Sequence, residues 1–494
     1  MRWLMVTGTV RGVDAASDRE RCLLHRLGQG PWTAAAPVPY SGSHRSPGGP
    51  TLSIIPPLLC LALLVALPTR ATAEVLTGDL DGVHDPAVVR GPDGWYLFGT
   101  GAGIPTWWSP DLRRWTRRRP VLPTALPPWA AAIVPGTQFP WAPDLSWWGG
   151  RWHLYHSIST FGSQTSAIGL LTSPALGDDA RWTDEGVVLT SDTTSPWNAI
   201  DPNPVVDEQG VPWLAWGSFW GGIFLQQLDP ATGKLAPGTL AHRLATRDPW
   251  VSGIEAPYLV RRGDHWYLFA AYGWCCRGTA STYNIRVGRS AAITGPYADD
   301  RGRPLLADGG TLVLGGYGDV RGPGHQAVVQ DGERWWLVHH WYDAARGGVP
   351  TLGLHRLLWR DDGWPVAAPA DFEPAPAVPP GRSLRGTWHL EGYEADFLAT
   401  PASRTLVLRA RAGARHPRRG RAWSADGRAR GRWEWAHGQM RIALRDRCAG
   451  SVMRLALWID AGARRGAGRD ADGTPWRAVH LGSDVGRRRG GPCR

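Results

Sequence analysis

The sequence predicts an all-β protein, made of a five-bladed β-propeller and a small C-terminal β domain. A short polar motif recurs five times, and each copy leads through a polar turn into an aromatic strand. A strand-turn-strand unit that recurs in this way is typical of a propeller, with one four-stranded blade per copy. The chain has 30 Trp, 63 Gly and 42 Pro and no extended helical periodicity, which favours many short strands and tight turns.

The five copies share a polar residue followed by small or branched apolar residues. They are His84-Asp85-Pro86-Ala87, Ala142-Pro143-Asp144-Leu145, Asp201-Pro202-Asn203-Pro204, Glu255-Ala256-Pro257-Tyr258 and Gly324-His325-Gln326-Ala327. Aligned on Asp85, Asp144, Asp201, Glu255 and His325, successive copies are 59, 57, 54 and 70 residues apart. Because the innermost strands of a propeller line its central channel, we expect these five side chains to converge on one axis.

The chain of 494 residues is long enough for two domains. In residues 1–73, a basic flank, an apolar run from Leu52 to Leu67 and an Ala-x-Ala ending at Ala73 predict a secretory signal peptide and hence a secreted protein. The run is short for a membrane span, so no membrane attachment is expected after cleavage. We expect the propeller over 75–365, a Pro/Ala-rich linker over 366–380 and an Arg-rich β domain over 381–494.

The basic charge is concentrated in the last domain. The whole chain has a formal charge of +11, whereas residues 381–494 contain 24 Arg and 10 acidic residues, a net +14. Such a surface could bind nucleic acid, anionic lipid or an acidic polysaccharide, and a solvated arginine-rich face is the simpler interpretation. Because the excess lies outside the propeller, we do not expect a nucleic-acid-binding protein.

Cleavage of the leader would leave four cysteines. In an oxidising compartment Cys448 and Cys493 could pair. The adjacent Cys275 and Cys276 could form a vicinal disulfide or remain free thiols, and the sequence leaves both open. Their spacing does not match a zinc site.

Several carboxylates converging in an aromatic-lined funnel suit the cleavage of a glycosidic bond. This reaction needs one protonated carboxyl group to donate to the leaving oxygen and one ionised carboxylate on the opposite face. Glu255 is our candidate for the acid, because it is the one Glu among the five and has the longest reach. Asp85 and Asp201 are candidate partners, whereas Asp144 is expected to be structural. His325 is either a structural residue or part of a metal site.

The sequence resembles glycoside hydrolase family 43, and within it the secreted endo-1,5-α-L-arabinanases. Six short stretches and one longer one carry the resemblance, in order and at matching spacing. They are Val83–Pro86, Trp141–Asp144, Ala199–Pro204, Gly217–Gly222, Ile254–Tyr258, Gly322–His325 and, most specifically, Cys275–Ser290.

The resemblance implies a propeller that hydrolyses internal α-1,5-L-arabinofuranosidic bonds of arabinan with inversion. It makes Asp85 the general base, Glu255 the general acid and Asp201 the residue that positions Glu255 and modulates its pKa. It places His325 in the water-mediated shell of a structural calcium ion on the propeller axis, although Gln326-Ala327 departs from the family pattern there.

Two other functions compete with this interpretation. An exo-acting α-L-arabinofuranosidase or β-xylosidase could use the same scaffold, with a different groove shape. A non-catalytic carbohydrate-binding propeller is expected to lack at least one of the three acids, and all three are present.

Aromatic and polar residues beside the motifs are candidate substrate contacts, because sugar rings pack their C–H faces on aromatic rings. The candidates are Trp141, Asn198, Ser218, Phe219, Trp220 and Tyr283; the aromatic ones could instead fill gaps between blades. Arabinan is a side chain of pectin, whose backbone is a polyanion, so the basic C-terminal domain could hold the enzyme near that acidic backbone.

Overall fold

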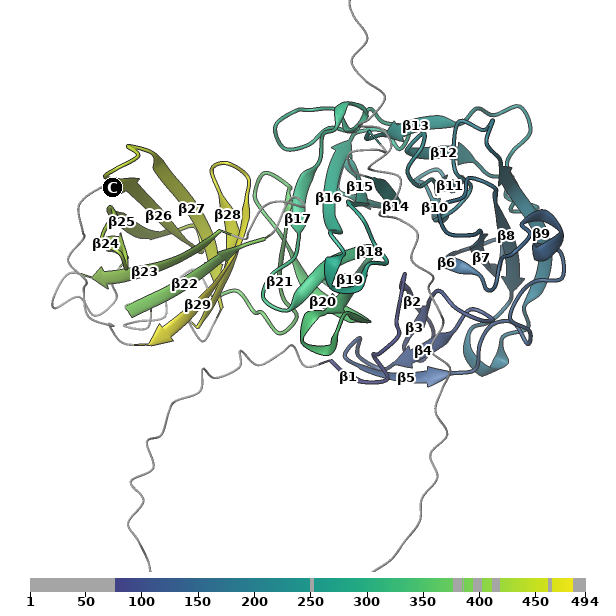
Figure 1. Ribbon diagram of the computed structural model, residues 1–494, viewed down its shortest axis with the longest axis horizontal. Helices are drawn as coiled ribbons and strands as arrows, with labels where there is room; N and C mark the ends of the chain where they lie inside the picture. The colour runs from purple at the N-terminus through teal and green to yellow at the C-terminus, as the bar shows by residue number, and fades with distance from the viewer. Residues whose placement is uncertain are drawn as a thin grey trace, which may run out of the picture. The chain divides into compact units, whose positions relative to one another are not determined.

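In the computed structural model the chain forms a five-bladed propeller and a closed β-barrel (Figure 1). The structure describes residues 76–248, 253–375, 384, 386–393, 402–410, 418–460 and 464–482. The predicted leader with its signal peptide lies outside these ranges, as does Cys493. Within them, no helix is both long and apolar enough to cross a membrane.

Each blade is an antiparallel sheet whose strands follow one another in chain order, and β1 adds a parallel edge strand to the first. The first three blades contain β1 (Thr77–Gly78), β2 (Ala87–Arg90), β3 (Trp95–Phe98), β4 (Thr106–Ser109) and β5 (Arg114–Arg118); β6 (Trp141–Trp148), β7 (Arg151–Ile158), β8 (Ser166–Ser173) and β9 (Thr183–Ser191); and β10 (Asn203–Val206), β11 (Pro212–Trp216), β12 (Ile223–Gln227) and β13 (His242–Ala245).

The last two blades contain β14 (Ile254–Arg262), β15 (His265–Tyr272), β16 (Asn284–Ser290) and β17 (Thr311–Leu314), then β18 (Val320–Asp331), β19 (Arg334–Asp343), β20 (Val349–Trp359) and β21 (Pro365–Pro369). Single-turn helices lie in the connections: α1 (Ala130–Ile133) and the 3-10 turns Gly177–Asp179, Gly278–Ala280, Leu305–Ala307 and Ala344–Arg346.

The five blades close into a ring. The innermost strands β2, β6, β10, β14 and β18 contact one another in turn, and β18 contacts β2. The N-terminal segment also reaches the fifth blade, where Gly82 N–H donates to the Pro350 carbonyl at 2.9 Å and Asp81 bridges to Thr351. The predicted five-bladed propeller is therefore confirmed.

The hydrophobic core lies between neighbouring blades, which is why the second strand of a blade is apolar on both faces. All four residues of β3 are buried. One cluster joins the first and fifth blades through Val88, Leu97 and Trp107 on one side and Val338 and Leu352 on the other. This packing holds the inner strands, and the side chains that they carry, in fixed positions around the channel.

The last propeller strand corrects the predicted linker. β21 continues through Pro369, so the strand enters the range 366–380 that the Pro/Ala-rich composition assigned to a linker. Val366, Ala367 and Ala368 are buried. Their small apolar side chains pair with β20 and pack on its neighbours, and the prolines stand only at the two ends of the strand, where a missing N–H is tolerated.

The C-terminal domain is an eight-stranded barrel in which each strand pairs with the next and β29 closes on β22. Its strands are β22 (Gly386–Gly392), β23 (Ser403–Ala410), β24 (Arg419–Ser424), β25 (Ala429–Ala436), β26 (Gln439–Asp446), β27 (Val452–Ile459), β28 (Arg465–Asp470) and β29 (Pro475–Gly482). Trp388, Leu406, Trp433, Leu457 and their neighbours fill the interior. The predicted C-terminal β domain is thus confirmed.

Candidate active site

The five motif copies share an unusual backbone conformation at or near the start of each inner strand. Asp85, Ala142, Asp201, Ala256 and His325 all have a positive φ, between 42° and 57°. The first four of them precede a proline. Non-glycine residues in this region are strained and persist where the surrounding structure enforces them, often at functional sites.

This shared conformation corrects the alignment of the motifs. Asp144 and Glu255 are not equivalent to Asp85; the equivalent residues are Ala142 and Ala256. Asp144 lies two residues further along its strand, and Glu255 lies one residue earlier. The ladder is irregular between Trp141 and Asp144 and between Glu255 and Tyr258, as at a β-bulge, which re-aims side chains. The residue before the proline, and not the polar residue, is therefore the equivalent position in the first four motifs.

Neighbouring blades hold this strained residue through its backbone N–H. The N–H of Asp85 donates to His340 Nδ1 at 3.1 Å, that of Ala142 to Thr100 Oγ1 at 2.8 Å, and that of Asp201 to Ser157 Oγ at 2.9 Å. In each case the acceptor comes from the preceding blade around the ring. The ring therefore fixes the site by a relay of hydrogen bonds from blade to blade.

Asp85 is buried among hydrogen-bond donors. Thr100 Oγ1 donates to its Oδ2 at 2.5 Å, His84 Nδ1 lies 2.9 Å from the same oxygen, and His325 Nδ1 lies 3.1 Å from Oδ1. Burial raises the pKa of Asp85, but the charges and hydrogen bonds of His84 and His325 outweigh it and hold the pKa well below its usual range. Asp85 is therefore ionised at any pH near neutrality.

Glu255 is buried in a different environment. Ser218 donates to its Oε2 at 2.5 Å, and the Tyr283 hydroxyl donates to Oε1. Burial raises the pKa of Glu255 and outweighs the lowering by these two donors, while the charge of Asp85 raises it further. Glu255 therefore retains its proton to higher pH than an exposed Glu.

Asp201 is coupled to Glu255. Its Oδ2 accepts a hydrogen bond from the N–H of Ala256 at 3.0 Å, on the residue that follows Glu255. Burial, together with the negative charges of Glu255 and Asp85, raises the pKa of Asp201 to about 8, although His325 lowers it. The structure thus gathers the three predicted acids Asp85, Asp201 and Glu255 around His325, with opposite pKa shifts on Asp85 and Glu255.

His325 lies among these carboxylates. Burial lowers its pKa, but Asp85, Asp201 and Glu255 together raise it to about 9. Its Nδ1 faces Asp85, which leaves the N–H at Nε2 to donate to a water molecule. The adjacent Gln326 has a buried Oε1 without a hydrogen-bond partner among the described residues. An amide oxygen such as this one is a ligand that calcium accepts, and an ion bound there would take the rest of its six to eight oxygen ligands from water.

A second group of ligand atoms lies beside Asp85. Atoms of His84, Asp85 and His340 approach within 4.8 Å of one another. Two imidazoles and one carboxylate suit a transition metal better than calcium. His340 is fully buried, its ring stacks on His84 at 3.9 Å, and burial holds its pKa well below the usual value, so it is a neutral support for the Asp85 backbone.

Asp144 has the structural position that the sequence suggested. Asn203 Nδ2 donates to its Oδ2 at 2.7 Å, and the N–H of Leu145 donates to Oδ1 at the same distance. Burial raises its pKa to about 7. Asn203 in turn accepts from the N–H of Leu259 at 2.8 Å, so this chain of bonds links the second, third and fourth blades.

The predicted substrate-contact residues divide into two groups. Asn198 is only 2% exposed, and its Oδ1 accepts a hydrogen bond from Ser166 at 2.8 Å, so this oxygen is bonded within the protein and the contact of Asn198 with substrate stays a prediction. Ser218 and Tyr283 are also buried, and both donate a hydrogen bond to Glu255.

Aromatic side chains near the acid remain available to a ligand. Trp141 and Phe219 are half-buried, and Trp220 is exposed. Phe219 packs against Trp274 with ring centroids 4.9 Å apart, and the Arg277 guanidinium lies 4.4 Å from the centre of the Trp274 ring. Since Phe219 follows Ser218 directly, this row of rings begins beside Glu255.

The adjacent cysteines are paired, which is one of the two states that the sequence left open. Cys275 and Cys276 form a vicinal disulfide, with Cys276 Sγ 4.0 Å from His84 Nε2. Cys448 is also disulfide-bonded, while the proposed partner Cys493 lies outside the described residues.

Our sequence interpretation missed the residues that support Asp85. They are His84, Thr100, His340 and Tyr342, the last of which bonds His84 Nε2 at 2.8 Å and accepts from the N–H of Cys276. Only His84 had a signal in the sequence, as the neighbour of Asp85 in the motif. The others follow or lie within second strands of blades, where nothing in the local pattern marks them.

The comparisons with known proteins agree with this geometry. The family model of the glycosyl hydrolases family 43 matches residues 75–365. The chain belongs to this family. As a family 43 protein it is a glycosidase, and the matched residues coincide with the propeller that carries the three acids.

Two curated relatives of this family 43 chain are similar over the propeller. An extracellular endo-α-(1→5)-L-arabinanase of Bacillus subtilis (strain 168) is 40% identical over 287 residues, 57% of this chain and 87% of that protein. An extracellular exo-α-(1→5)-L-arabinofuranosidase of Cellvibrio japonicus (strain Ueda107) is 39% identical over 322 residues, 62% of this chain and 91% of that protein.

A solved structure extends the likeness of fold beyond the propeller. The endo-1,5-α-L-arabinanase of Thermotoga petrophila RKU-1 matches with a TM-score of 0.67 over 82% of this chain and 100% of that chain. At 22% sequence identity, this similarity concerns the fold alone.

Proposed function

We propose that the protein is an endo-acting arabinanase, which hydrolyses internal α-1,5-L-arabinofuranosidic bonds with inversion. The observation that carries the hydrolytic mechanism is the contrast between two buried carboxyl groups in one site. Asp85 lies against His84, His325 and Thr100, and the two histidines hold its pKa low, whereas burial raises the pKa of Glu255. Environments that push two pKa values apart assign one group as base and the other as acid. The similarity to an endo-arabinanase supplies the substrate class.

In this mechanism Glu255 donates its proton to the glycosidic oxygen as the bond to the anomeric carbon breaks. Asp85, ionised, takes a proton from a water molecule that attacks the opposite face of the sugar, so the product has inverted configuration. Ser218 and Tyr283 fix the two oxygens of Glu255, and Thr100 and His84 fix Oδ2 of Asp85. Both groups are thus oriented before substrate binds.

We also propose a structural calcium ion beside His325. Gln326 Oε1 and water would hold it, with His325 hydrogen-bonded to that water, and the ion would add positive charge near the three carboxylates and favour their ionised forms.

Product analysis on linear 1,5-arabinan tests the proposed function. We expect mixed arabino-oligosaccharides early in the reaction, and a loss of about 10²-fold or more for Glu255→Ala and for Asp85→Ala, as removal of a general acid or base requires. Glu333→Ala, which removes an exposed carboxylate in the β18–β19 turn, is the matched control and should retain full activity. A Glu255→Ala protein with more than a tenth of the activity would overturn the assignment.

The second candidate function is exo action on the same bonds. It is favoured by the similarity to the exo-acting enzyme of Cellvibrio japonicus, which is nearly as close as that to the endo-acting enzyme. Arabinose or one short oligosaccharide as the sole early product would identify it.

Two further proposals concern where the enzyme acts. Secretion follows from the predicted signal peptide, and the two relatives carry the word extracellular in their names. N-terminal sequencing of the exported protein would test cleavage after Ala73. The basic barrel would hold the enzyme near the acidic backbone of pectin, to which arabinan is attached.

A further inference from the structure

The barrel carries unpaired arginines on one outer face. Along β24 to β27 side chains alternate: Ala422, Trp433, Ile442 and Leu455 point into the core, and their neighbours point outward. The outward positions include five exposed arginines, which we call the arginine face: Arg421, Arg430, Arg432, Arg441 and Arg454.

The strand register places three of these arginines in one row across the sheet. Arg421 pairs with Arg432, Arg432 with Ala443, and Ala443 with Arg454, so one row crosses four strands. Strands lie about 4.8 Å apart, and like charges directly opposite one another are destabilising. The fold itself gains nothing from this row, which contains no carboxylate between its arginines.

The arginine face also lacks internal ion pairs. Among the residues that the structure describes, no carboxylate lies within ion-pairing distance of any of the five. Elsewhere in the barrel arginines that support the fold are paired: Arg465 with Asp460 at 3.0 Å and Arg477 with Glu391 at 2.8 Å. The contrast separates arginines that stabilise the domain from arginines that face outward with their charge unmatched.

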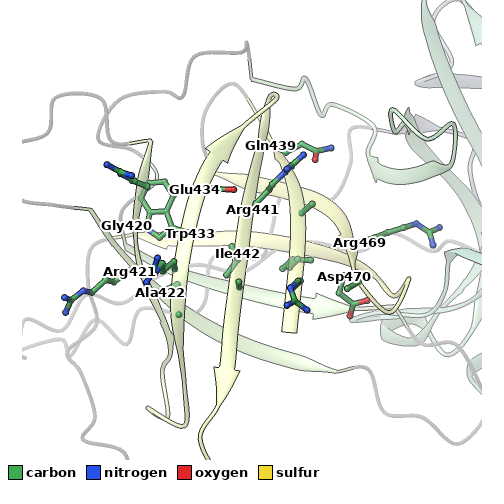
Figure 2. A pocket seen from close by; sticks show the side chains of 18 of the residues that line it. Gly420, Arg421, Ala422, Trp433, Glu434, Gln439, Arg441, Ile442, Arg469 and Asp470 are labelled. Atoms are coloured by element: carbon green, nitrogen blue, oxygen red, sulfur yellow. The ribbon is translucent and has the colours of Figure 1, made fainter. Parts of the chain in front are cut away.

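The same face forms a groove. Its barrel lining includes eight arginines and two carboxylates, so the barrel side of the groove is positively charged. Small residues lie on its floor, such as Ala443 and Ala456 between longer side chains. Figure 2 shows Arg421 and Arg441 projecting from their strands, with Glu434 on the strand next to Arg441.

A tryptophan lies at one edge of the groove. Trp423 is half-buried, pairs across the strands with Arg430, and has an indole N–H without a hydrogen-bond partner among the described residues. Its ring also lies 5.3 Å from the Arg409 guanidinium. A ring face beside planar guanidinium groups suits a ligand that alternates sugar rings with anionic groups.

We propose that the arginine face binds a linear acidic polysaccharide whose negative charges are carboxylates, such as polygalacturonate. Guanidinium groups bind carboxylates through paired hydrogen bonds, and a row of them across neighbouring strands matches a chain that presents carboxylates at intervals. The choice of a polysaccharide over other polyanions rests on the proposed action on arabinan, and it gives the basic barrel a defined surface.

The test is binding of the full-length protein to immobilised polygalacturonate across a salt series. The variant is Arg421→Gln/Arg432→Gln/Arg454→Gln, which removes the charges of one row. The control is Arg404→Gln/Arg428→Gln/Arg447→Gln, which removes the same charge from exposed residues of the same domain that do not line the groove. Circular dichroism and thermal unfolding establish that both variants fold.

We expect the face variant to bind about tenfold or more weakly at low salt, since three exposed charge contacts together give an effect of that size, and the control to stay within about twofold of the parent. Binding should fade as the Debye length falls from about 10 Å at 0.1 M to about 3 Å at 1 M salt. Hydrolysis of short arabino-oligosaccharides should be equal in all three proteins.

Three results would overturn the proposal: no retention of the parent protein, equal weakening in the two variants, or tighter binding to duplex DNA than to polygalacturonate at the same salt. The first two results would mean that the arginine face is a solvated surface without a ligand. The third would mean that it binds a different polyanion. Because retention is measured without substrate, failure here is distinct from failure to hydrolyse arabinan, which would instead overturn the proposed function.

Discussion

The carboxylate of Asp201 accepts a hydrogen bond from the backbone N–H of Ala256, at 3.0 Å. The bond connects the third blade to the residue that follows Glu255, so one side chain both orients the inner strand of the fourth blade and brings its charge close to the acid. Charge and position are therefore separable by substitution, because an amide can still accept this hydrogen bond after the charge is removed.

Asp201→Asn should move the basic limb of the pH profile to lower pH. Burial raises the pKa of both Asp201 and Glu255, and the negative charge of Glu255 raises the pKa of Asp201 further. Repulsion between two ionised carboxylates acts on both of them. When the charge at position 201 is lost, the ionised form of Glu255 is less disfavoured, so Glu255 gives up its proton at lower pH. The measurement is kcat/KM against pH, which reports the free enzyme.

The comparison for this variant is Asp201→Ala, which removes the acceptor as well. We expect it to show the same direction of shift with a larger loss of activity, because the inner strand beside Glu255 also loses its support. A basic limb that stays in place in both variants would show that Asp201 does not set the pKa of Glu255.

Ser218→Ala should move the same limb in the opposite direction. Its hydroxyl donates to Glu255 Oε2 at 2.5 Å and lowers the pKa of Glu255. Without this donor the ionised carboxylate is less stable, so Glu255 keeps its proton to higher pH. Ser218→Thr retains the hydroxyl and should restore the parent profile, provided that the added methyl fits. Movement of the limb to lower pH in Ser218→Ala would contradict the assignment of Glu255 as the acid.

Chelation should lower the thermal stability of the protein if calcium binds beside His325. An ion that binds only the folded state stabilises it by about 2.7 kcal/mol when its concentration is 100 times the dissociation constant. The measurement is the unfolding midpoint with EDTA and after calcium is restored. His325→Ala should abolish the response, whereas His265→Ala, remote from the channel, should preserve it. An unchanged midpoint in the parent protein would exclude a tightly bound stabilising ion.

Much of the fold could be predicted from the sequence because each copy of the repeated motif corresponds to one blade of the propeller. Each blade needs an inner strand and an aromatic second strand that packs on the next blade, so the five motifs recur in phase with the five sheets. The register within the motif was harder to predict. Asp144 and Glu255 were aligned with Asp85 by polarity, whereas the positive φ before the proline makes Ala142 and Ala256 the equivalent residues.

Of the residues in the site, only the charged ones could be identified from the sequence. Asp85, Asp201 and Glu255 stand in recognisable motifs, but Thr100 and His340 approach Asp85 from other strands, and nothing next to them in the chain indicates this. Asn198 was predicted to contact the substrate. Asn198 lies in the connection between β9 and β10, and its Oδ1 accepts a hydrogen bond from Ser166, a contact between segments far apart in the chain.

The aromatic row beside the acid gives a prediction that separates substrate binding from packing. Phe219 is half-buried, its ring lies over Gly253, and it packs on Trp274. A Cβ at Gly253 would meet this ring at 2.2 Å, so the chain has kept the smallest residue beneath it. We expect Phe219→Ala to raise KM for arabinan, because a sugar ring would lose its apolar partner, with a smaller effect on stability.

Phe224 is the matched control for this substitution. It is 7% exposed and packs against Trp216 and Trp197 between blades. Phe224→Ala should lower the free energy of unfolding by about 3–5 kcal/mol, as for other large-to-small changes in a core, and leave KM near that of the parent. The two measurements are urea unfolding and steady-state kinetics on linear arabinan. If Phe219→Ala instead loses stability as Phe224→Ala does while KM is unchanged, the ring at position 219 serves packing, and the substrate groove must run along other residues.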